Sequence, residues 1–258
     1  MTQTAANTKV TYICCSNDTR QLDTMLMPSL RRLSGQRGAQ VNWLVIDTTA
    51  NRYPSAARAY NKEVAKHVSE MGDILVFCHN DIAFDDASFH DFVVGSLLED
   101  PNQIIGVAGK DTQNRVPSNL RYRSTGAYIT RTRISEPTEV CSLDECCFAL
   151  TADLFRQLGF DEQTCYHWHL YAVDLCYAAR LRFGTRSVVS PQSIYHKQSG
   201  DSGLYTDQKF LRTMWRMVKK YHRKTPMLFT PCYHCSTNYL QALSKLTKTT
   251  LQNILHRL

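Results

Sequence analysis

Residues 73–81 read DILVFCHND, and this stretch decides the expected fold. An uninterrupted apolar run, Ile74 to Cys78, is followed at once by His79, Asn80 and Asp81. A short continuous apolar run of this kind is typical of a strand that is buried on both faces of a parallel sheet. Polar groups directly after such a strand lie at its carboxyl end, where open α/β sheets bind their ligands.

Two earlier stretches repeat this pattern of an apolar run with a polar end. Residues 10–15 (VTYICC) and 41–47 (VNWLVID) predict strands, and helices are expected over 23–33 and 55–69. Strands that alternate with helices predict an α/β fold with a mostly parallel sheet flanked by helices on both faces. The polar groups at the ends of these two strands should converge with His79 on one crevice: Ser16, Asn17, Asp18 and Asp47.

The missing motifs narrow the chemistry of that crevice. Neither a G-x-G-x-x-G nor a Walker A sequence follows a predicted strand, which disfavours dinucleotide-binding and P-loop proteins. A carboxylate and an imidazole suit Mn2+ or Mg2+ paired with a substrate diphosphate. Taken alone, Asp81 is equally compatible with a turn or an N-cap role.

The composition is that of a globular protein with one large domain or one domain and a short appendage. The chain has 258 residues, of which 11 are Gly and 8 are Pro, and no apolar run approaches the roughly 20 residues of a membrane span. No signal peptide is apparent at its start, so we expect a cytoplasmic protein whose ten cysteines are reduced. The single CxxC, Cys232 to Cys235, leaves half of a zinc site as an alternative.

The positive charge is concentrated at the C-terminal end. The chain carries 30 Lys+Arg and 23 Asp+Glu, yet residues 204–258 hold ten of the basic residues and one acid, Asp207. We therefore expect a catalytic body over 1–203 and a basic helical extension over 204–258, with a helix over 208–221. The extension is interpreted as helices docked on the body, as a surface attracted to an anionic membrane, or as both. A further apolar stripe follows on Leu240, Leu243, Leu251, Ile254 and Leu258.

A second polar cluster lies at the start of a predicted helix in residues 169–184 (HLYAVDLCYAARLRFG). Tyr171 and Asp174 are three residues apart and share one helix face. An acid beside aromatic side chains suits a wall that stacks on a sugar and a base that accepts a proton. The alternative for Asp174 is a salt bridge with Arg180 or Arg182.

With these stretches in order, the sequence resembles family 2 glycosyltransferases with the GT-A fold. It is most similar to a bacterial glycosyltransferase-like branch whose metal motif reads H-x-D and whose catalytic helix opens with H-[FL]-Y-x-x-D. The resemblance runs from about residue 10 to residue 202. Four elements carry it: the strand that ends at Asp47, the Asn61 helix leading into FCHND, LDECCFALTADLF with GFDE, and HLYAVDLCYAARLRFG through YHKQSG.

The resemblance implies a nucleotide-sugar donor, with UDP as the expected nucleotide, a divalent metal, and inversion at the anomeric carbon. It implies transfer to a hydroxyl of a glycan or lipid-linked acceptor in cell-envelope polysaccharide synthesis. A location at the inner face of the membrane is expected only from the charge and helical periodicity of the C-terminal extension. Asp174 would be the general base. The implied metal ligands are Asp81, His196 and His79. The implied donor-binding residues are Ser16, Asn17, Asp18, Asp47, Asn61, Asn80 and Asp144, and the implied acceptor-binding residues are Trp168, His169 and Tyr171.

Three positions depart from the pattern of the wider family. His79 stands where many relatives have the first Asp of D-x-D, although the H-x-D branch shares this feature. Ala172 stands where an acid is frequent, which leaves Asp174 as the only carboxylate of that turn. Glu145 replaces a frequent Gly after Asp144, and we expect it to narrow the sugar pocket.

Two other functions are weighed against this interpretation. A sugar nucleotidyltransferase also uses strand-end carboxylates and a metal, but it requires a Gly-rich basic loop where this chain has Ser16 to Arg20. A noncatalytic polyanion- or nucleic-acid-binding protein would use aromatic residues interleaved with Lys and Arg in the extension. Those aromatic residues are Tyr205, Phe210, Trp215 and Tyr221.

Overall fold

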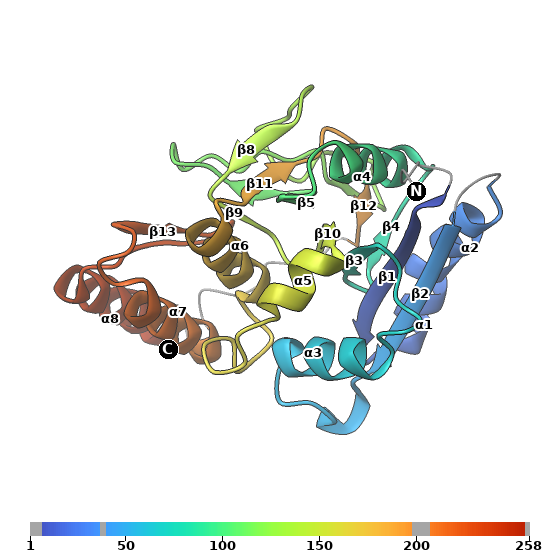
Figure 1. Cartoon of the computed structure of the whole chain (residues 1–258). Coiled ribbons are helices and arrows are strands. Elements are labelled where there is room, and N and C mark those ends of the chain that lie inside the picture. Colours follow the sequence, from blue (N-terminus) through green and yellow to red (C-terminus); the bar gives the residue numbers. More distant parts are fainter. Residues whose placement is uncertain (1–6, 37–39, 198–206, 256–258) are drawn as a thin grey trace.

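The structure is a computed structural model, and it describes residues 7–36, 40–197 and 207–255. Its centre is a seven-stranded sheet (Figure 1). In spatial order the strands are β2 (Gln40–Asp47), β1 (Lys9–Ser16), β3 (Ile74–Cys78), β10 (Cys147–Thr151), β5 (Gln103–Gly106), β11 (Arg186–Val189) and β8 (Thr138–Val140). All run in one direction except β10 and β8, which are antiparallel to their neighbours. The expected α/β fold with a mostly parallel sheet is confirmed.

Both faces of the sheet are buried, which explains the uninterrupted apolar run of β3. Successive side chains of a strand point to opposite faces, so Phe77 joins one hydrophobic cluster and Val76 the other. The first cluster includes side chains of α3 (Ala56–Lys66), α5 (Ala152–Leu158) and α6 (Tyr171–Phe183). The second includes side chains of α1 (Thr19–Thr24), α2 (Leu26–Ser34) and α4 (Ser88–Glu99).

The helix expected over 23–33 is two helices, α1 and α2, so that prediction is wrong in detail. Met25 separates them with φ −116° and ψ −73°. Pro28 supplies the physical reason, because it has no N–H to donate to the carbonyl of Thr24 and its ring would clash with that carbonyl in a continuous helix. Asp18 begins α1 as its N-cap, accepting a hydrogen bond from the Gln21 amide at 3.0 Å.

Short strands bring distant segments together at the carboxyl end of β3. A three-stranded sheet has the order β4 (Ile82–Ala83), β12 (Tyr195–His196) and β7 (Arg121–Tyr122). In it, His196 lies opposite Ile82, the residue after Asp81. A second pair, β6 (Gly109–Lys110) with β9 (Ser142–Leu143), supports the turn that leads into β10.

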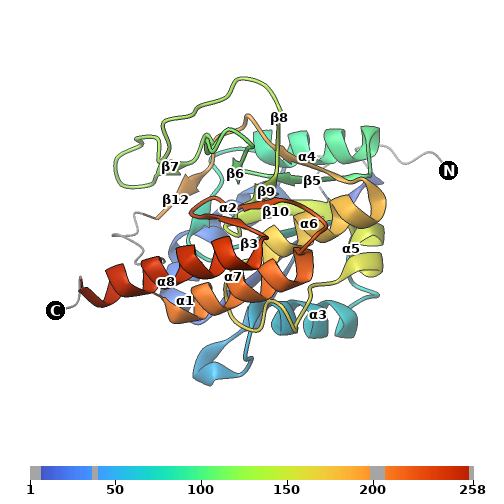
Figure 2. The same ribbon diagram turned by 90° about the vertical axis from the view of Figure 1, so that its left-hand side faces the viewer.

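The C-terminal extension packs on the body. It contains α7 (Gln208–Tyr221), the hairpin β13 (Met227–Phe229) and β14 (His234–Ser236), and α8 (Tyr239–Leu255). Figure 2 shows α7 and α8 side by side. A third hydrophobic cluster joins Val173 and Tyr177 of α6 to Met214 and Met217 of α7. The predicted boundary between residues 203 and 204 lies outside the described residues.

The burial of residues in the extension bears on two alternatives from the sequence, namely nucleic-acid binding by its aromatic residues and a zinc site at Cys232 and Cys235. Phe210 and Tyr221 are each 1% exposed, so their rings are not available as stacking platforms for bases. Cys235 is fully buried in the third cluster, and in the described part of the chain the Cys232–Cys235 pair belongs to no group of three close metal ligands. None of the helices over the described residues has the length and apolar character that crossing a bilayer requires.

Candidate active site

The three predicted metal ligands meet at the carboxyl end of β3. His79 Nδ1 lies 3.9 Å, and His196 Nε2 3.5 Å, from Asp81 Oδ1. Ligand atoms of all three lie within 4.8 Å of one another, and no other such group of His, Cys, Asp or Glu occurs among the described residues. The pairing of β12 with β4 holds His196 here, and the Lys197 amide donates to the Asp81 carbonyl at 2.9 Å.

The state of these side chains fits a divalent cation. Asp81 Oδ1 is buried and accepts no hydrogen bond within the described residues. A buried carboxylate oxygen without a partner is costly, and coordination of a cation removes that cost. Burial lowers the pKa of His79 although Asp81 and Asp144 oppose this change, so the ring favours the neutral form that coordinates metals. The two imidazoles and the carboxylate are suitable ligands for Mn2+.

The predicted donor-binding residues of β1 and β3 form one hydrogen-bonded wall beside Asp81. Asn80 Nδ2 donates to Ser16 Oγ at 3.0 Å, and Asn80 Oδ1 accepts a hydrogen bond from Gln21 Nε2 at 2.9 Å. The Ser16 hydroxyl in turn donates to the Asp18 carbonyl at 3.1 Å. Asn17 lies in the same turn with an exposed side chain. The ends of β1 and β3 are therefore joined at the place where the sequence predicts the nucleotide.

Asp47 lies next to this wall, at the end of β2. The parallel register places it opposite Ser16. Its Oδ1 accepts hydrogen bonds from the Thr49 amide at 2.9 Å and the Thr49 hydroxyl at 2.7 Å, which lower the pKa of Asp47. Its Oδ2 lies 3.4 Å from Arg52 Nη1, and the side chain is 49% exposed, so a ligand can still reach this ionised carboxylate.

Asn61 has a different environment from the other predicted donor-binding residues. Its Nδ2 donates to the Phe160 carbonyl at 2.8 Å and to Glu162 Oε1 at 3.1 Å. Its Oδ1 accepts a hydrogen bond from the Phe160 amide at 2.9 Å. Both ends of the side-chain amide are thus used to position the loop after α5. The donor-binding role of Asn61 stays a prediction.

The turn between β9 and β10 places two acids side by side. Asp144 Oδ1 accepts a hydrogen bond from the Cys146 amide at 2.9 Å, and the charge of Asp144 acts on His79. Glu145, which the sequence predicts to narrow the sugar pocket, has an Oε1 that is buried without a hydrogen-bond partner in the described chain. Burial and the neighbouring Asp144 raise the pKa of Glu145 to about 8. The sequence indicates the importance of Glu145 only by the departure from the family pattern, in which Gly is frequent at this position.

Replacing Glu145 by Gln should therefore change how stability depends on pH. The folded-state pKa lies above the ordinary value of 4.5, so ionisation of Glu145 costs folding free energy as pH rises from about 4.5 to about 8. Gln cannot ionise, so the Tm of the Glu145→Gln variant relative to wild type should rise over that window and level off above it. Thermal unfolding in EDTA from pH 4.5 to 9 measures this difference. A difference in Tm between variant and wild type that stays constant from pH 4.5 to 9 would contradict the raised pKa of Glu145.

Asp174 lies in the first turn of α6 with a side chain only 3% exposed. Lys220 Nζ donates to its two oxygens at 2.8 and 2.7 Å, and the Tyr221 hydroxyl donates to Oδ1 at 2.8 Å. Burial raises the pKa of Asp174, while Lys220 and Tyr221 act against that rise. Lys220 also contacts Asp161 Oδ2 at 2.8 Å. Asp174 therefore joins α6 to α7 through a buried ion pair.

The ion-pair partner of Asp174 differs from the alternative considered from sequence. Arg180 donates instead to the carbonyls of Val140 and Cys141, and Arg182 donates to the carbonyl of Gln157. Although burial raises the pKa of Asp161, Lys220 and Thr164 lower it to about 2. One Lys of the extension thus holds two carboxylates of the body.

The three predicted acceptor-binding residues differ in their availability. Trp168 is 40% exposed and can stack on a ligand. The ring of Tyr171 is buried against Tyr60 and Phe160, and only its hydroxyl approaches the metal ligands, 3.5 Å from His79 Nε2. His169 Nε2 lies 3.0 Å from Asp207 Oδ2, at the start of α7. Their acceptor-binding roles stay predictions, and Trp168 has the most open surface.

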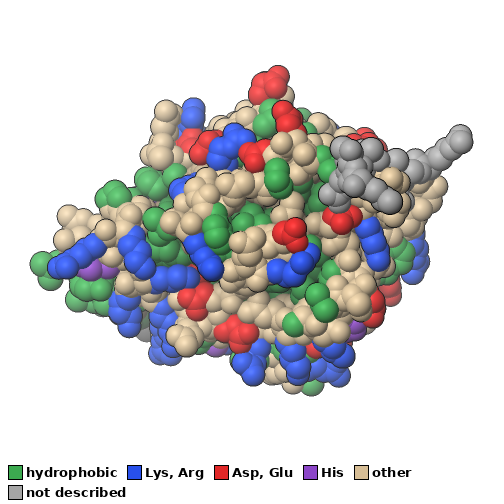
Figure 3. Space-filling model, in the orientation of Figure 1, with side chains coloured by type: hydrophobic (Ala, Val, Ile, Leu, Met, Phe, Trp, Pro, Cys, Tyr) green, Lys and Arg blue, Asp and Glu red, His purple; other side chains and the backbone are tan. Residues whose placement is uncertain are grey.

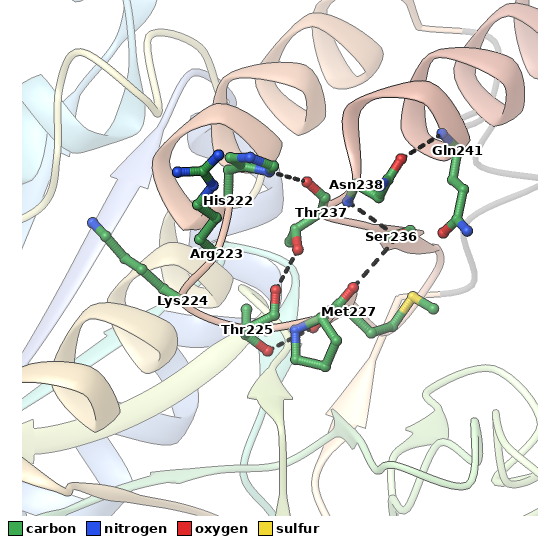
Figure 4. Close-up of a pocket in the computed structure, with 10 residues that line it drawn as sticks. His222, Arg223, Lys224, Thr225, Met227, Ser236, Thr237, Asn238 and Gln241 are labelled. Carbon is green, nitrogen blue, oxygen red and sulfur yellow. Dashed lines mark hydrogen bonds between the residues drawn. The ribbon is translucent and has the colours of Figure 1, made fainter.

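A pocket of about 610 Å³ in the extension has a structural explanation. It lies between the turn that follows α7 and the turn that precedes α8, and none of the three metal ligands lines it. Figure 4 shows its polar groups bonded to one another. His222 Nδ1 lies 2.8 Å from the Thr237 carbonyl, and the Thr237 hydroxyl donates to the Thr225 carbonyl. These hydrogen bonds connect the chain segments on either side of the β13–β14 hairpin, between α7 and α8.

Comparison with known proteins rests on structure. No family model matches the sequence, and no curated protein is similar to it. The mannosyltransferase PcManGT from Pyrobaculum calidifontis, solved with GDP-Man and Mn2+, superposes with a TM-score of 0.57 at 12% identity. That match covers 96% of this chain and 74% of the other chain.

Two further solved structures share the fold. Glucosyl-3-phosphoglycerate synthase from Mycobacterium tuberculosis, solved with Mn2+, UDP-glucose and phosphoglyceric acid, has a TM-score of 0.50 at 15% identity, covering 82% of this chain and 80% of that enzyme. GalNAc-T7, solved with UDP, GalNAc and Mn2+, has a TM-score of 0.51 at 11% identity. The match covers 95% of this chain but only 54% of GalNAc-T7. The chain has the GT-A fold of these glycosyltransferases, with a His-x-Asp cluster at the carboxyl end of β3.

Proposed function

We propose that the protein is a metal-dependent glycosyltransferase that uses a nucleotide-sugar donor. The observation that carries this proposal is the cluster of His79, Asp81 and His196 at the carboxyl end of β3, where Asp81 presents a buried oxygen that has no hydrogen-bond partner among the described residues. A divalent cation held there would neutralise the negative charge of the departing diphosphate, an effect worth several kcal/mol. The three solved structures compared above each contain Mn2+, together with UDP, GDP-Man or UDP-glucose.

The wall of Ser16, Asp18 and Asn80 supports a nucleotide site next to the cluster. Asp47 is open at its edge and would accept hydrogen bonds from the base or the ribose hydroxyls. UDP is the nucleotide that the sequence predicts. The half-buried Asp144 and Glu145 would face the sugar, with Glu145 narrowing the space available to it.

We propose transfer by inversion, to a hydroxyl of a glycan or lipid-linked acceptor in cell-envelope polysaccharide synthesis. A base must then remove the proton of that hydroxyl, and Asp174 is the residue predicted from sequence. In this structure both of its oxygens take hydrogen bonds from Lys220, so the role requires the carboxylate to part from Lys220. We also propose that the protein is located in the cytoplasm, with the extension close to the inner face of the membrane.

Thermal unfolding tests the donor site directly. UDP, GDP, CDP and dTDP would each be added with Mn2+, Mg2+ or EDTA. A nucleotide at 100 times its Kd stabilises the folded state by about 2.7 kcal/mol, which corresponds to a rise in Tm of roughly 5–10 °C for a chain of this size. We expect such a rise with UDP and Mn2+ and none with UDP and EDTA. Equal shifts in EDTA, or no shift with any nucleotide, would overturn the proposed donor site.

A further inference from the structure

A groove of about 650 Å³ runs between α7 and α8 on the surface of the extension. We call this surface the α7–α8 groove. Its walls are mainly apolar, and the aromatic ring of Trp215 forms part of them. The apolar and aromatic lining residues are Tyr166, Leu211, Trp215, Leu243, Leu246 and Leu251.

The rim of the α7–α8 groove is cationic. Arg212, Arg216 and Lys219 line it, and no described lining residue is acidic. Arg216 is engaged, because its guanidinium lies 3.6 Å from the ring centroid of Tyr166 and donates to the Gln163 carbonyl. Arg212 and Lys219 form no ion pair or hydrogen bond through their side chains with the described residues. Two cations are therefore available to an anionic ligand at an apolar surface.

The apolar surface continues along α8. Leu240, Leu243, Leu251 and Ile254 are 80%, 54%, 56% and 50% exposed. Their spacing places them on one face of the helix, and Ala242 and Leu246, on the neighbouring face, pack into the third hydrophobic cluster. Figure 3 shows Lys and Arg side chains gathered around this end of the molecule. An exposed apolar stripe with flanking cations is typical of a helix that lies in a membrane interface.

We propose that the α7–α8 groove and the exposed stripe of α8 dock on an anionic phospholipid bilayer. The leucines enter the boundary between headgroups and acyl chains, and Arg212 and Lys219 contact lipid phosphates. This deepens the membrane contact proposed above by naming its surface, and its test needs neither donor nor metal.

The positive charge of the extension favours an anionic bilayer over the other possible partners of the α7–α8 groove. The only acid of residues 207–255, Asp207, is already paired with His169, while nine Lys and Arg lie in the same segment. Each basic residue near an anionic lipid surface strengthens the attraction to it. A second copy of this chain would bring the same cations face to face, and a neutral bilayer would leave them without partners.

Trp215 provides a reporter within the groove. Trp43 and Trp168 are replaced by Phe, so that the fluorescence comes from Trp215 alone. Vesicles of phosphatidylcholine and phosphatidylglycerol, with acyl chains brominated near the headgroup, are added in EDTA without nucleotide. We expect a blue shift and quenching of Trp215 with the anionic vesicles, and neither with pure phosphatidylcholine. An unquenched Trp215 in the presence of anionic vesicles would overturn the proposal.

Matched variants separate the groove from general surface charge and general hydrophobicity. Leu243→Ser with Leu251→Ser should weaken vesicle binding at least tenfold, whereas Val68→Ser with Leu181→Ser, at sites 55% and 49% exposed outside the extension, should change it less than twofold. Arg212→Gln with Lys219→Gln should weaken binding more than Arg223→Gln with Lys224→Gln. Equal losses in test and control pairs would contradict docking through the groove. Sedimentation without vesicles tests whether the protein instead forms a dimer that buries the α7–α8 groove. Such a dimer would also overturn the proposal of membrane docking.

Discussion

Replacing Asp81 by Ala should reduce sugar transfer by about 10³-fold or more, because several kcal/mol of leaving-group stabilisation depend on the metal. His79 Nδ1 and His196 Nε2 both approach the same atom, Asp81 Oδ1, so the substitution removes the ligand at the centre of the site. The fold should remain intact. Asp81 Oδ1 has no hydrogen-bond partner among the described residues, so its removal in EDTA should leave the Tm unchanged or raise it.

The matched control for this variant is Asp85→Ala. Asp85 is an acid of the same segment, but its side chain is 54% exposed, and its one ionic contact with the described residues, to Arg123, has a length of 3.4 Å. It should retain transfer and the metal-dependent response to UDP. Turnover that survives in purified Asp81→Ala protein and remains sensitive to EDTA would show that the metal binds elsewhere.

The second large effect concerns the buried ion pair between α6 and α7. Lys220→Met leaves the Asp174 carboxylate buried with Tyr221 as its remaining partner. Breaking a buried pair by removing one partner costs about 3–5 kcal/mol, which corresponds to a loss in Tm of roughly 6–20 °C. Differential scanning calorimetry measures this loss. A change below about 1 kcal/mol would place the pair in the class of weak surface salt bridges.

Comparing Asp174→Asn with Lys220→Met separates a base from a positioning residue. Both substitutions break the ion pair, but only the first removes the carboxylate. If Asp174 is the general base, Asp174→Asn lowers kcat by 10²–10⁴-fold, and Lys220→Met lowers it far less at a temperature where both variants are folded. Equal losses of kcat would mean that Asp174 acts through the docking of α7, and the base would have to be sought elsewhere in the site.

The parts of the fold that depend on local patterns could be predicted from the sequence. The apolar run of β3 and the helical spacing of α7 are each determined by burial along one element, and α7 begins and ends at the predicted residues 208 and 221. The separation of α1 from α2 was also encoded locally, by Pro28. That signal was missed because the apolar spacing of residues 23–33 continues across the break.

The interactions that depend on tertiary docking could not be read from the sequence. Lys220 lies in a helix whose basic residues looked like a solvated or membrane-facing surface, yet its side chain is only 24% exposed and is paired with Asp161 and Asp174. Tyr171 shares a helix face with Asp174 as expected, but the packing of α6 against α3 and the loop after α5 places its ring in the core. The approach of His196 to Asp81 depends on the short β4–β12 pairing and was indicated only by the resemblance.

The most direct test of the account is a titration of Mn2+ into the purified protein, followed by the electron paramagnetic resonance signal of free Mn2+, with and without UDP. The account predicts one bound Mn2+ per chain, tighter binding in the presence of UDP, and loss of this site in Asp81→Ala but not in Asp85→Ala. Binding of UDP with no Mn2+ uptake, or equal Mn2+ uptake by wild type and Asp81→Ala, would contradict it.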